Sequence, residues 1–184
     1  GWINFIELNY PDLLDNLSTA KSPQSMFGAM LKTYYAKKQG IDPSKIVSVS
    51  IMPCTAKKFE AQRRELSASG YADTDIVLTT TELAQMIKEA NINFFALPEE
   101  EFDPIMGAGS GAGTIFGATG GVMEAAVRTA YKLIVGEEME PMELDAVRGL
   151  EGIKEAEVDF GGKVTLKVAI AHGLANARKV CELI

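Results

Sequence analysis

A cysteine and a lysine one helical turn apart are the residues of this sequence best suited to chemistry. Cys54 comes just after a β-rich run, residues 45–52, and just before a charged segment, residues 56–66, that predicts a helix. A helix N-terminus offers free N–H groups and a positive dipole end, which favour the thiolate form that binds metal. Lys57 lies near the same helical face, and Glu60 lies a further turn on, where its carboxylate could hold the lysine. This spacing makes a thiolate metal ligand beside a cationic donor possible.

The same positions have a simpler interpretation. A buried, unreactive Cys54 with a surface pair of Lys57 and Glu60 fits the spacing, and position alone favours it. The metal hypothesis stays open because ligand sites in α/β folds gather beyond the carboxyl ends of strands. The sequence has two cysteines and one histidine, whereas a structural zinc site usually takes four such ligands, so a self-contained zinc site is not expected. A disulfide between Cys54 and Cys181 has no other support in the sequence.

Composition and charge exclude other classes of function. The chain has 184 residues, 47% of them hydrophobic, which suffices for a packed core. A net charge of −7 argues against a nucleic-acid binder, which needs a basic face. No apolar run approaches the roughly 18 residues of a membrane helix. A cytoplasmic location is the expectation, and a periplasmic one stays open because the chain opens with Gly1-Trp2 and need not begin at a natural start.

Helices and strands alternate along the first half of the chain. Ser22 is a good N-cap, Pro23 suits a first helical turn and Gly40 is a natural stop, so residues 23–39 predict a helix. Further helices are predicted at residues 2–17, with a break near Pro11, and at 56–66, 82–90, 123–134 and from Gly173 to the end. Thr80 or Thr81 is the expected cap of the helix at 82–90.

Strands are predicted in both halves of the chain, at residues 45–52, 75–78, 144–148, 155–160 and 163–170. Gly161-Gly162 joins the last two as a hairpin turn, and residues 91–103 predict an irregular connection. The pattern indicates an α/β fold with a mixed sheet flanked by helices, and no domain boundary is visible. Gly107, Gly109 and Ala112 fit a dinucleotide fingerprint by spacing, but no apolar strand precedes them, so close backbone packing is the preferred interpretation.

Several stretches resemble the iron-only hydrogenases, and they occur in family order along the whole chain. The central one is Met52-Pro53-Cys54-x-x-Lys57-x-x-Glu60. The others are Ser18 with Lys21-Ser22-Pro23-Gln24-x-Met26-x-Gly28, the block GAGTIFGATGGVMEA at residues 111–125, Val147-Arg148-Gly149-Leu150, Gly152-Ile153-Lys154-Glu155-Ala156, and Gly1-Trp2 as the tail of a Cys-Cys-Pro-Gly-Trp motif. The resemblance implies one lobe of the hydrogenase catalytic domain.

This resemblance also implies a cofactor, the H-cluster. In the family, a four-iron cubane sits on four cysteine thiolates, and one thiolate bridges to a two-iron unit with carbon monoxide, cyanide and dithiolate ligands. The implied reaction is the reversible conversion of two protons and two electrons into H2, with the cofactor carrying the chemistry. The implied partners are the remainder of the hydrogenase chain and ferredoxin or another redox carrier.

The resemblance assigns roles to individual residues. Cys54 would be a cubane ligand, and Lys57 would donate to a cyanide of the two-iron unit. The expected walls of the pocket are Met52, Pro53, Pro23 and Gln24, with apolar cover from Phe116 and Val122. Ser18 matches a serine of the family's proton path, where a hydroxyl can accept and donate; a capping or surface role fits it equally well.

One departure from the family pattern concerns the other cysteines. The family's first cluster motif would lie before Gly1 and its last beyond Ile184, and Cys181 lies in no such motif. We therefore expect residues 1–184 to be part of an H-cluster domain that by itself holds no cubane and is inactive. The alternative function is a non-catalytic relative, used in iron–sulfur assembly or hydrogen sensing. Gln24, Met52, Lys57 and Phe116 favour the enzyme over an assembly protein, because their implied roles serve the two-iron unit.

Overall fold

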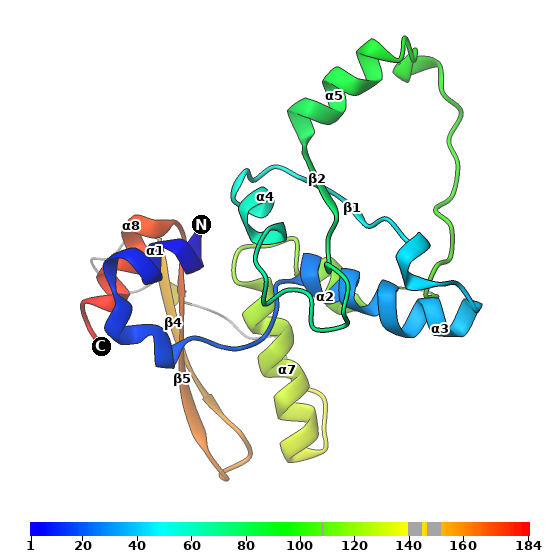
Figure 1. The fold of residues 1–184 in the computed structure, drawn as a ribbon. Helices are drawn as coiled ribbons and strands as arrows, with labels where there is room; N and C mark the ends of the chain where they lie inside the picture. Colours follow the sequence, from blue (N-terminus) through cyan, green and yellow to red (C-terminus); the bar gives the residue numbers. More distant parts are fainter. Residues whose placement is uncertain (108, 140–144, 147–151) are drawn as a thin grey trace. The chain divides into compact units, whose positions relative to one another are not determined.

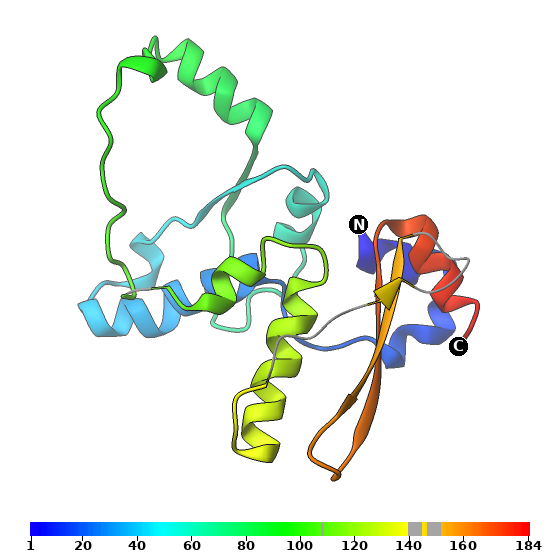
Figure 2. The ribbon, with the colours of Figure 1, turned by 180° about the vertical axis from the view of Figure 1, so that it is seen from behind.

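The structure, a computed structural model, describes residues 1–107, 109–139, 145–146 and 152–184 (Figures 1 and 2). Its contacts divide the chain into two compact units. One unit is Ser18–Gly107, and the other combines Gly1–Leu17 with Ala108–Ile184. The boundary after Gly107 falls at the start of a Gly-, Ala- and Ser-rich stretch, residues 107–113, whose sequence was interpreted as close backbone packing and not as a domain boundary.

The unit Ser18–Gly107 begins with a long helical path. Helix α2 (Pro23–Met30) starts at Ser22, whose side chain accepts a hydrogen bond from the backbone N–H of Ser25. The path continues through the π-helical segment η2 (Leu31–Tyr35) and α3 (Ala36–Gln39). It ends at Gly40, whose φ of 67° is the left-handed conformation expected of a C-terminal glycine. The predicted cap, stop and helical extent are confirmed.

A parallel pair of strands forms the sheet of this unit (Figure 1). Strand β1 (Val49–Met52) pairs with β2 (Ile76–Thr79), and Met52 lies opposite Thr79. The strand predicted at 45–52 is shorter in the structure: Lys45 belongs to the 3-10 turn η3 (Pro43–Lys45), and β1 begins only at Val49. The carboxyl ends of both strands lie at the same edge of the sheet, where the ligand sites of parallel sheets form.

Each strand leads directly into a helix. Helix α4 (Ala56–Ala61) follows β1, and it is shorter than the predicted 56–66. Helix α5 (Thr80–Glu89) follows β2, and its cap is Thr79, not Thr80 or Thr81. Thr79 and Glu82 form a capping box, in which each side chain accepts from the other's backbone N–H. After α5 the chain is irregular, as predicted, apart from the short turn η4 (Phe94–Ala96).

The second unit combines both ends of the chain. Its elements are α1 (Trp2–Asn9), η1 (Pro11–Asn16), α6 (Gly111–Ile115), α7 (Gly121–Val135), β3 (Asp145–Ala146), β4 (Ile153–Asp159), β5 (Thr165–Ala171) and α8 (Leu174–Cys181). The break near Pro11 is confirmed, because α1 ends at Asn9 and η1 begins at Pro11. The Gly161-Gly162 hairpin is confirmed as well, because both glycines have positive φ and lie between the paired strands β4 and β5. Residues 144, 147 and 148 of the predicted strand 144–148 lie outside the described residues.

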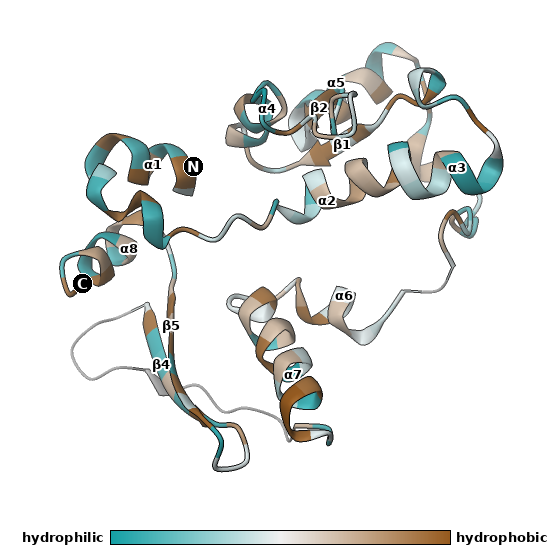
Figure 3. Ribbon diagram, turned by 60° about the horizontal axis from the view of Figure 1, so that its bottom comes forward, coloured by the Kyte–Doolittle hydropathy of each residue, from teal (hydrophilic) through white to brown (hydrophobic). Residues whose placement is uncertain are grey.

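The core of this unit lies between helix α7 and the β4–β5 hairpin. Val127 of α7 packs with Val158 and the fully buried Phe160, and Figure 3 shows hydrophobic (brown) and hydrophilic (teal) stretches along α7. At the other end of the hairpin, the guanidinium of Arg178 in α8 lies 5.5 Å from the ring of Phe5 in α1. These contacts tie the start of the chain to its end.

The α/β class is thus confirmed. In the part of the chain that the structure describes, parallel and antiparallel pairing occur in separate sheets, β1–β2 and β3–β4–β5, so the expected single mixed sheet is not found there. Among the described residues, no helix has the length and apolar character needed to cross a membrane.

Candidate functional site

The Cys54 thiol lies exposed at the carboxyl edge of the parallel strands. Three residues, Pro53, Cys54 and Thr55, separate β1 from α4 at this point, and Thr55 is the N-cap residue of the helix. The backbone N–H of Lys57 donates to the carbonyl oxygen of Cys54 at 3.2 Å, so the chain turns tightly into the helix directly after the cysteine. Cys181, by contrast, is buried in α8. Cys54 is therefore exposed, and not buried as the simpler interpretation expected.

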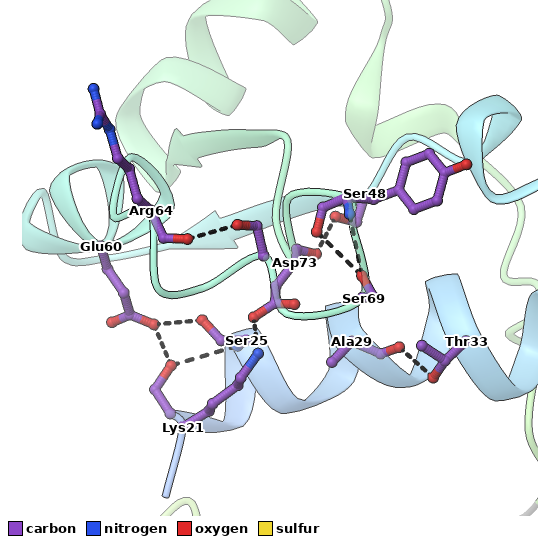
Figure 4. Close-up of polar contacts among 12 residues, drawn as sticks. Lys21, Ser25, Ala29, Thr33, Ser48, Glu60, Arg64, Ser69 and Asp73 are labelled. Atoms are coloured by element: carbon purple, nitrogen blue, oxygen red, sulfur yellow. Dashed lines mark hydrogen bonds and ion pairs between the residues drawn. The ribbon is translucent and has the colours of Figure 1, made fainter. Parts of the chain in front are cut away.

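The Lys57 ammonium is paired with Glu60, as their spacing suggested. Its Nζ lies 2.7 Å from Oε2 of Glu60. The other carboxylate oxygen, Oε1, accepts from the hydroxyls of Ser22 and Ser25, the latter at 3.0 Å. Figure 4 shows Glu60 and Ser25 pointing toward each other from α4 and α2. The pair is therefore joined to the capped start of α2, which a surface pair would not be.

Burial and hydrogen bonding act in opposite directions on Glu60. Partial burial by itself raises the pKa of this carboxyl group, but the hydrogen bonds from Lys57, Ser22 and Ser25 outweigh burial and lower the pKa below its ordinary value. Glu60 is therefore ionised at neutral pH and remains a strong acceptor for the ammonium.

Gln24 connects α2 to strand β1. Its side chain is only 7% exposed, and its Oε1 accepts from the Ser50 hydroxyl at 2.9 Å. Its Nε2 is buried without a hydrogen-bond partner in the described part of the chain. Buried polar groups are ordinarily satisfied, so an orphaned donor indicates a missing acceptor. Met52 lies on the same face of β1 as Ser50, since side chains two apart in a strand share a face.

The other predicted residues of this unit lie nearer the surface. Pro23 is exposed in the first turn of α2, and Pro53 is exposed between β1 and Cys54. Ser18 is exposed as well, and its hydroxyl accepts from the backbone N–H of Ala20 at 3.1 Å. In this structure Ser18 therefore stabilises a local turn.

Phe116 and Val122 belong to the other unit and lie at the junction of α6 and α7. They are 40% and 51% exposed. Gly121 passes so close to Ile115 that a Cβ atom there would lie 1.7 Å from the Ile115 carbonyl oxygen. This close approach brings the backbones of Gly121 and Phe116 together and requires glycine at position 121. A Cβ atom on Gly107 or Gly109 would meet no atom of the described residues within 4 Å, so the close backbone packing predicted there is wrong.

Sequence reasoning missed Ser25 and Ser50. Ser25 lies three residues after the Ser22 cap, and Ser50 lies two residues before Met52 on one face of a strand. Their spacing from Ser22 and Met52 could have drawn attention to them. Neither the serine side chain nor this spacing identifies their hydrogen-bond partners, Glu60 and Gln24. Among the described residues, no three His, Cys, Asp or Glu side chains gather to hold a metal ion. Cys54 is a candidate metal ligand because it lies at the carboxyl edge of the parallel strands and is exposed.

Curated relatives match almost the full length of the chain. The NADP-reducing hydrogenase subunit HndD from Solidesulfovibrio fructosivorans is 53% identical over 182 residues, which cover 99% of this chain and 31% of that protein. The periplasmic iron hydrogenase large subunit from Nitratidesulfovibrio vulgaris is 50% identical over 99% of the chain and 43% of its own length. A less similar relative, cytosolic iron-sulfur assembly component 3 from Pongo abelii, is 30% identical over 191 residues.

Solved structures show the same relationship. A variant of the [FeFe]-hydrogenase HydA1 from Chlamydomonas reinhardtii superposes with a TM-score of 0.82 at 42% identity, covering 100% of this chain and 53% of that one. The chain thus spans about a third to a half of the length of these relatives. The family model described as the C-terminal domain of the iron-only hydrogenase large subunit matches residues 1–184. The chain belongs to this iron-only hydrogenase family.

Proposed function

We propose that this chain supplies part of the H-cluster site of an iron-only hydrogenase. The single observation that supports the proposal best is the exposed Cys54 thiol at the carboxyl end of a parallel strand, with the Lys57 ammonium one helical turn away. The reaction proposed is the reversible conversion of two protons and two electrons into H2, with ferredoxin or another redox carrier exchanging the electrons.

The residues present fit such a cofactor. A thiolate is the ligand that iron–sulfur clusters take, and an exposed cysteine at a helix start is suited to that form. An ammonium has three N–H donors, and Glu60 takes one of those of Lys57. The remaining donors of Lys57 and the orphaned Nε2 of Gln24 can meet the anionic, acceptor-rich ligands of a two-iron unit.

Each residue then has a defined task beside the bound cofactor, which supplies the redox chemistry of hydrogen. Cys54 holds the cubane, and Lys57 donates to a cyanide. Met52, Pro53, Pro23 and Gln24 line the pocket, while Phe116 and Val122 exclude water from it. The hydroxyl of Ser18 accepts a proton and passes one on. Its hydrogen bond from the backbone N–H of Ala20 uses one lone pair of the oxygen, so the hydroxyl can still donate and accept.

Thiolates from elsewhere are part of this proposal. A cubane takes four thiolates, whereas residues 1–184 contain two cysteines, one of them buried in α8. Residues 1–184 would therefore contribute one ligand, Cys54, and the rest of the hydrogenase would contribute the others.

An assembly protein is the weaker alternative. The hydrogenases HndD and the periplasmic enzyme are 53% and 50% identical to this chain, against 30% for the assembly component. A paired lysine beside the cysteine also suits a two-iron unit with cyanide ligands more than a cubane alone.

Replacement of the cysteine tests the proposal. We expect Cys54→Ser, in the anaerobically matured protein that carries residues 1–184, to lose cluster iron and hydrogen evolution from reduced viologen. The loss of activity should exceed the roughly 10–100-fold that removal of an outer-shell partner of a metal site costs. Cys181→Ser is the matched control and should keep both. Full iron content and activity in Cys54→Ser would contradict the proposal.

A further inference from the structure

The carboxylate of Glu60 is fixed from three directions by side chains of two helices. Oε2 accepts from Lys57 at 2.7 Å within α4, and Oε1 accepts from Ser22 and Ser25 at the start of α2. Both oxygens are thus engaged, so the carboxylate has a defined orientation. Figure 4 shows this group of contacts around Glu60.

The serines distinguish this pair from an ordinary surface pair. Ser25 is only 1% exposed, so its hydroxyl has little access to water and depends on Glu60 as an acceptor. The Ser22 hydroxyl donates to Glu60, and its oxygen accepts from the backbone N–H of Ser25, so the helix cap itself positions the carboxylate. A neighbouring pair, Lys58 of α4 with Glu82 of α5, is exposed on both sides, and its carboxylate belongs to the capping box of α5.

We propose that Glu60 is a positioning residue, which holds the Lys57 ammonium in place for its hydrogen bond to the cofactor, and that Ser22 and Ser25 in turn hold Glu60. This inference rests on the proposed function. It extends the site by a chain of hydrogen bonds that starts at the hydroxyls of Ser22 and Ser25, passes through the Glu60 carboxylate and ends at the Lys57 ammonium.

A lysine needs such support because its side chain is long and loses much rotamer freedom when one geometry is imposed. Glu60 restricts that freedom before the cofactor binds and leaves the remaining N–H donors of Lys57 available. Outer-shell residues of this kind orient and tune the groups that contact a cofactor.

The test uses the infrared bands of the cyanide ligands in the matured protein, because a band shifts when the hydrogen bond to its cyanide changes. The variants are Lys57→Ala, Glu60→Gln, Glu60→Asp and Ser25→Ala, with Glu82→Gln as the matched control. We expect Glu60→Gln to shift the cyanide band in the same direction as Lys57→Ala, by a smaller amount, and to lower hydrogen evolution about 10-fold. Glu60→Asp should restore part of the shift, because it keeps the charge at a shorter reach, and Glu82→Gln should shift nothing.

Two results would overturn the inference in distinguishable ways. If Lys57→Ala shifts the band and Glu60→Gln leaves it unchanged, the positioning role is wrong while the proposed function stands. If the matured wild-type protein has no carbon monoxide or cyanide bands, the proposed function fails and this inference fails with it. Ser25→Ala supplies the same comparison if Glu60→Gln does not fold, as judged by circular dichroism: an unchanged band there also contradicts the inference.

Discussion

Cys54 and Lys57 illustrate how exposure changes the meaning of a short motif. By position alone, a buried thiol and a surface ion pair were the simpler interpretation. In the structure the thiol is exposed, and the ion pair is anchored to a second helix through Ser25. Glu60, which the sequence suggested only as a partner for Lys57, also accepts hydrogen bonds from Ser22 and Ser25.

A second lysine, Lys32, gives a prediction about stability and pH. Its side chain is 3% exposed, and its Nζ lies 2.6 Å from Asp75, which also accepts from the backbone N–H of Ser48. Partial burial by itself raises the pKa of Asp75, but the hydrogen bonds from Lys32 and Ser48 and the charge of Lys32 lower it overall. Because the folded pKa is depressed, this contribution to stability is full above the ordinary carboxyl pKa, about 3.9, and is lost as pH falls through the folded value.

We therefore expect Asp75→Asn to lower the free energy of unfolding at neutral pH by about 3 kcal/mol, because it leaves a buried ammonium unpaired. The variant should also lose less stability than the wild type as pH falls below about 4. Urea unfolding across this pH range measures both effects. Glu138→Gln, which breaks an exposed pair with Lys132, is the control and should change little. Equal effects of the two variants would contradict the account.

At the scale of elements, the position of α2 depends on a close backbone approach. A Cβ atom on Gly28 would lie 1.8 Å from the carbonyl oxygen of Asp73. The same segment is tied to α2 by the ion pair of Lys21 with Asp73, at 2.6 Å. Glycine at this position lets the helix that carries Ser22 and Gln24 approach the loop leading into β2.

Gly28→Ala should therefore be destabilising although alanine favours helices. We expect a cost of at least about 1–3 kcal/mol, the usual range for overpacking in a close contact. Gly113→Ala is the matched control in α6, where no atom lies within 4 Å, and it should be neutral or slightly stabilising. Thermal unfolding of the two variants compares them, and a neutral Gly28→Ala would show that the close approach is not required.

Local signals predicted the elements well and their contacts poorly. The Ser22 cap, the Gly40 stop and the Gly161-Gly162 turn follow from backbone preferences that a few residues determine. The burial of Lys32 does not follow from such local preferences. Lys32 lies in the π-helical segment η2, and its partner Asp75 is 43 positions away in the sequence. The cap at Thr79 was missed because that residue also ends strand β2.

At the scale of the whole molecule, the predicted site residues divide between two units. Cys54, Lys57 and the residues of α2 and β1 lie in Ser18–Gly107, while Phe116 and Val122 lie in the other unit. Sequence patterns report local structure, so they identified the family blocks without revealing this division. The proposal that Phe116 and Val122 cover the cofactor therefore rests on the family match alone.

The number of thiols in residues 1–184 predicts that this chain alone binds no four-iron cluster. With two cysteines, one of them buried, it cannot supply the four thiolates of a cubane. We expect the purified chain, reconstituted with iron and sulfide, to show no stoichiometric iron and no iron–sulfur absorption in the visible range. Stoichiometric iron that persists after Cys54→Ser would count most strongly against the proposed ligand.

The central claim is that the Cys54 thiolate binds cluster iron with the Lys57 ammonium beside it. A crystal structure of the matured protein, with anomalous scattering measured at the iron edge, tests this claim most directly. The account predicts an iron peak at bonding distance from Cys54 Sγ and the Lys57 Nζ directed to the two-iron end of the cluster. Iron peaks bound by other residues, with the Cys54 thiol free, would contradict it.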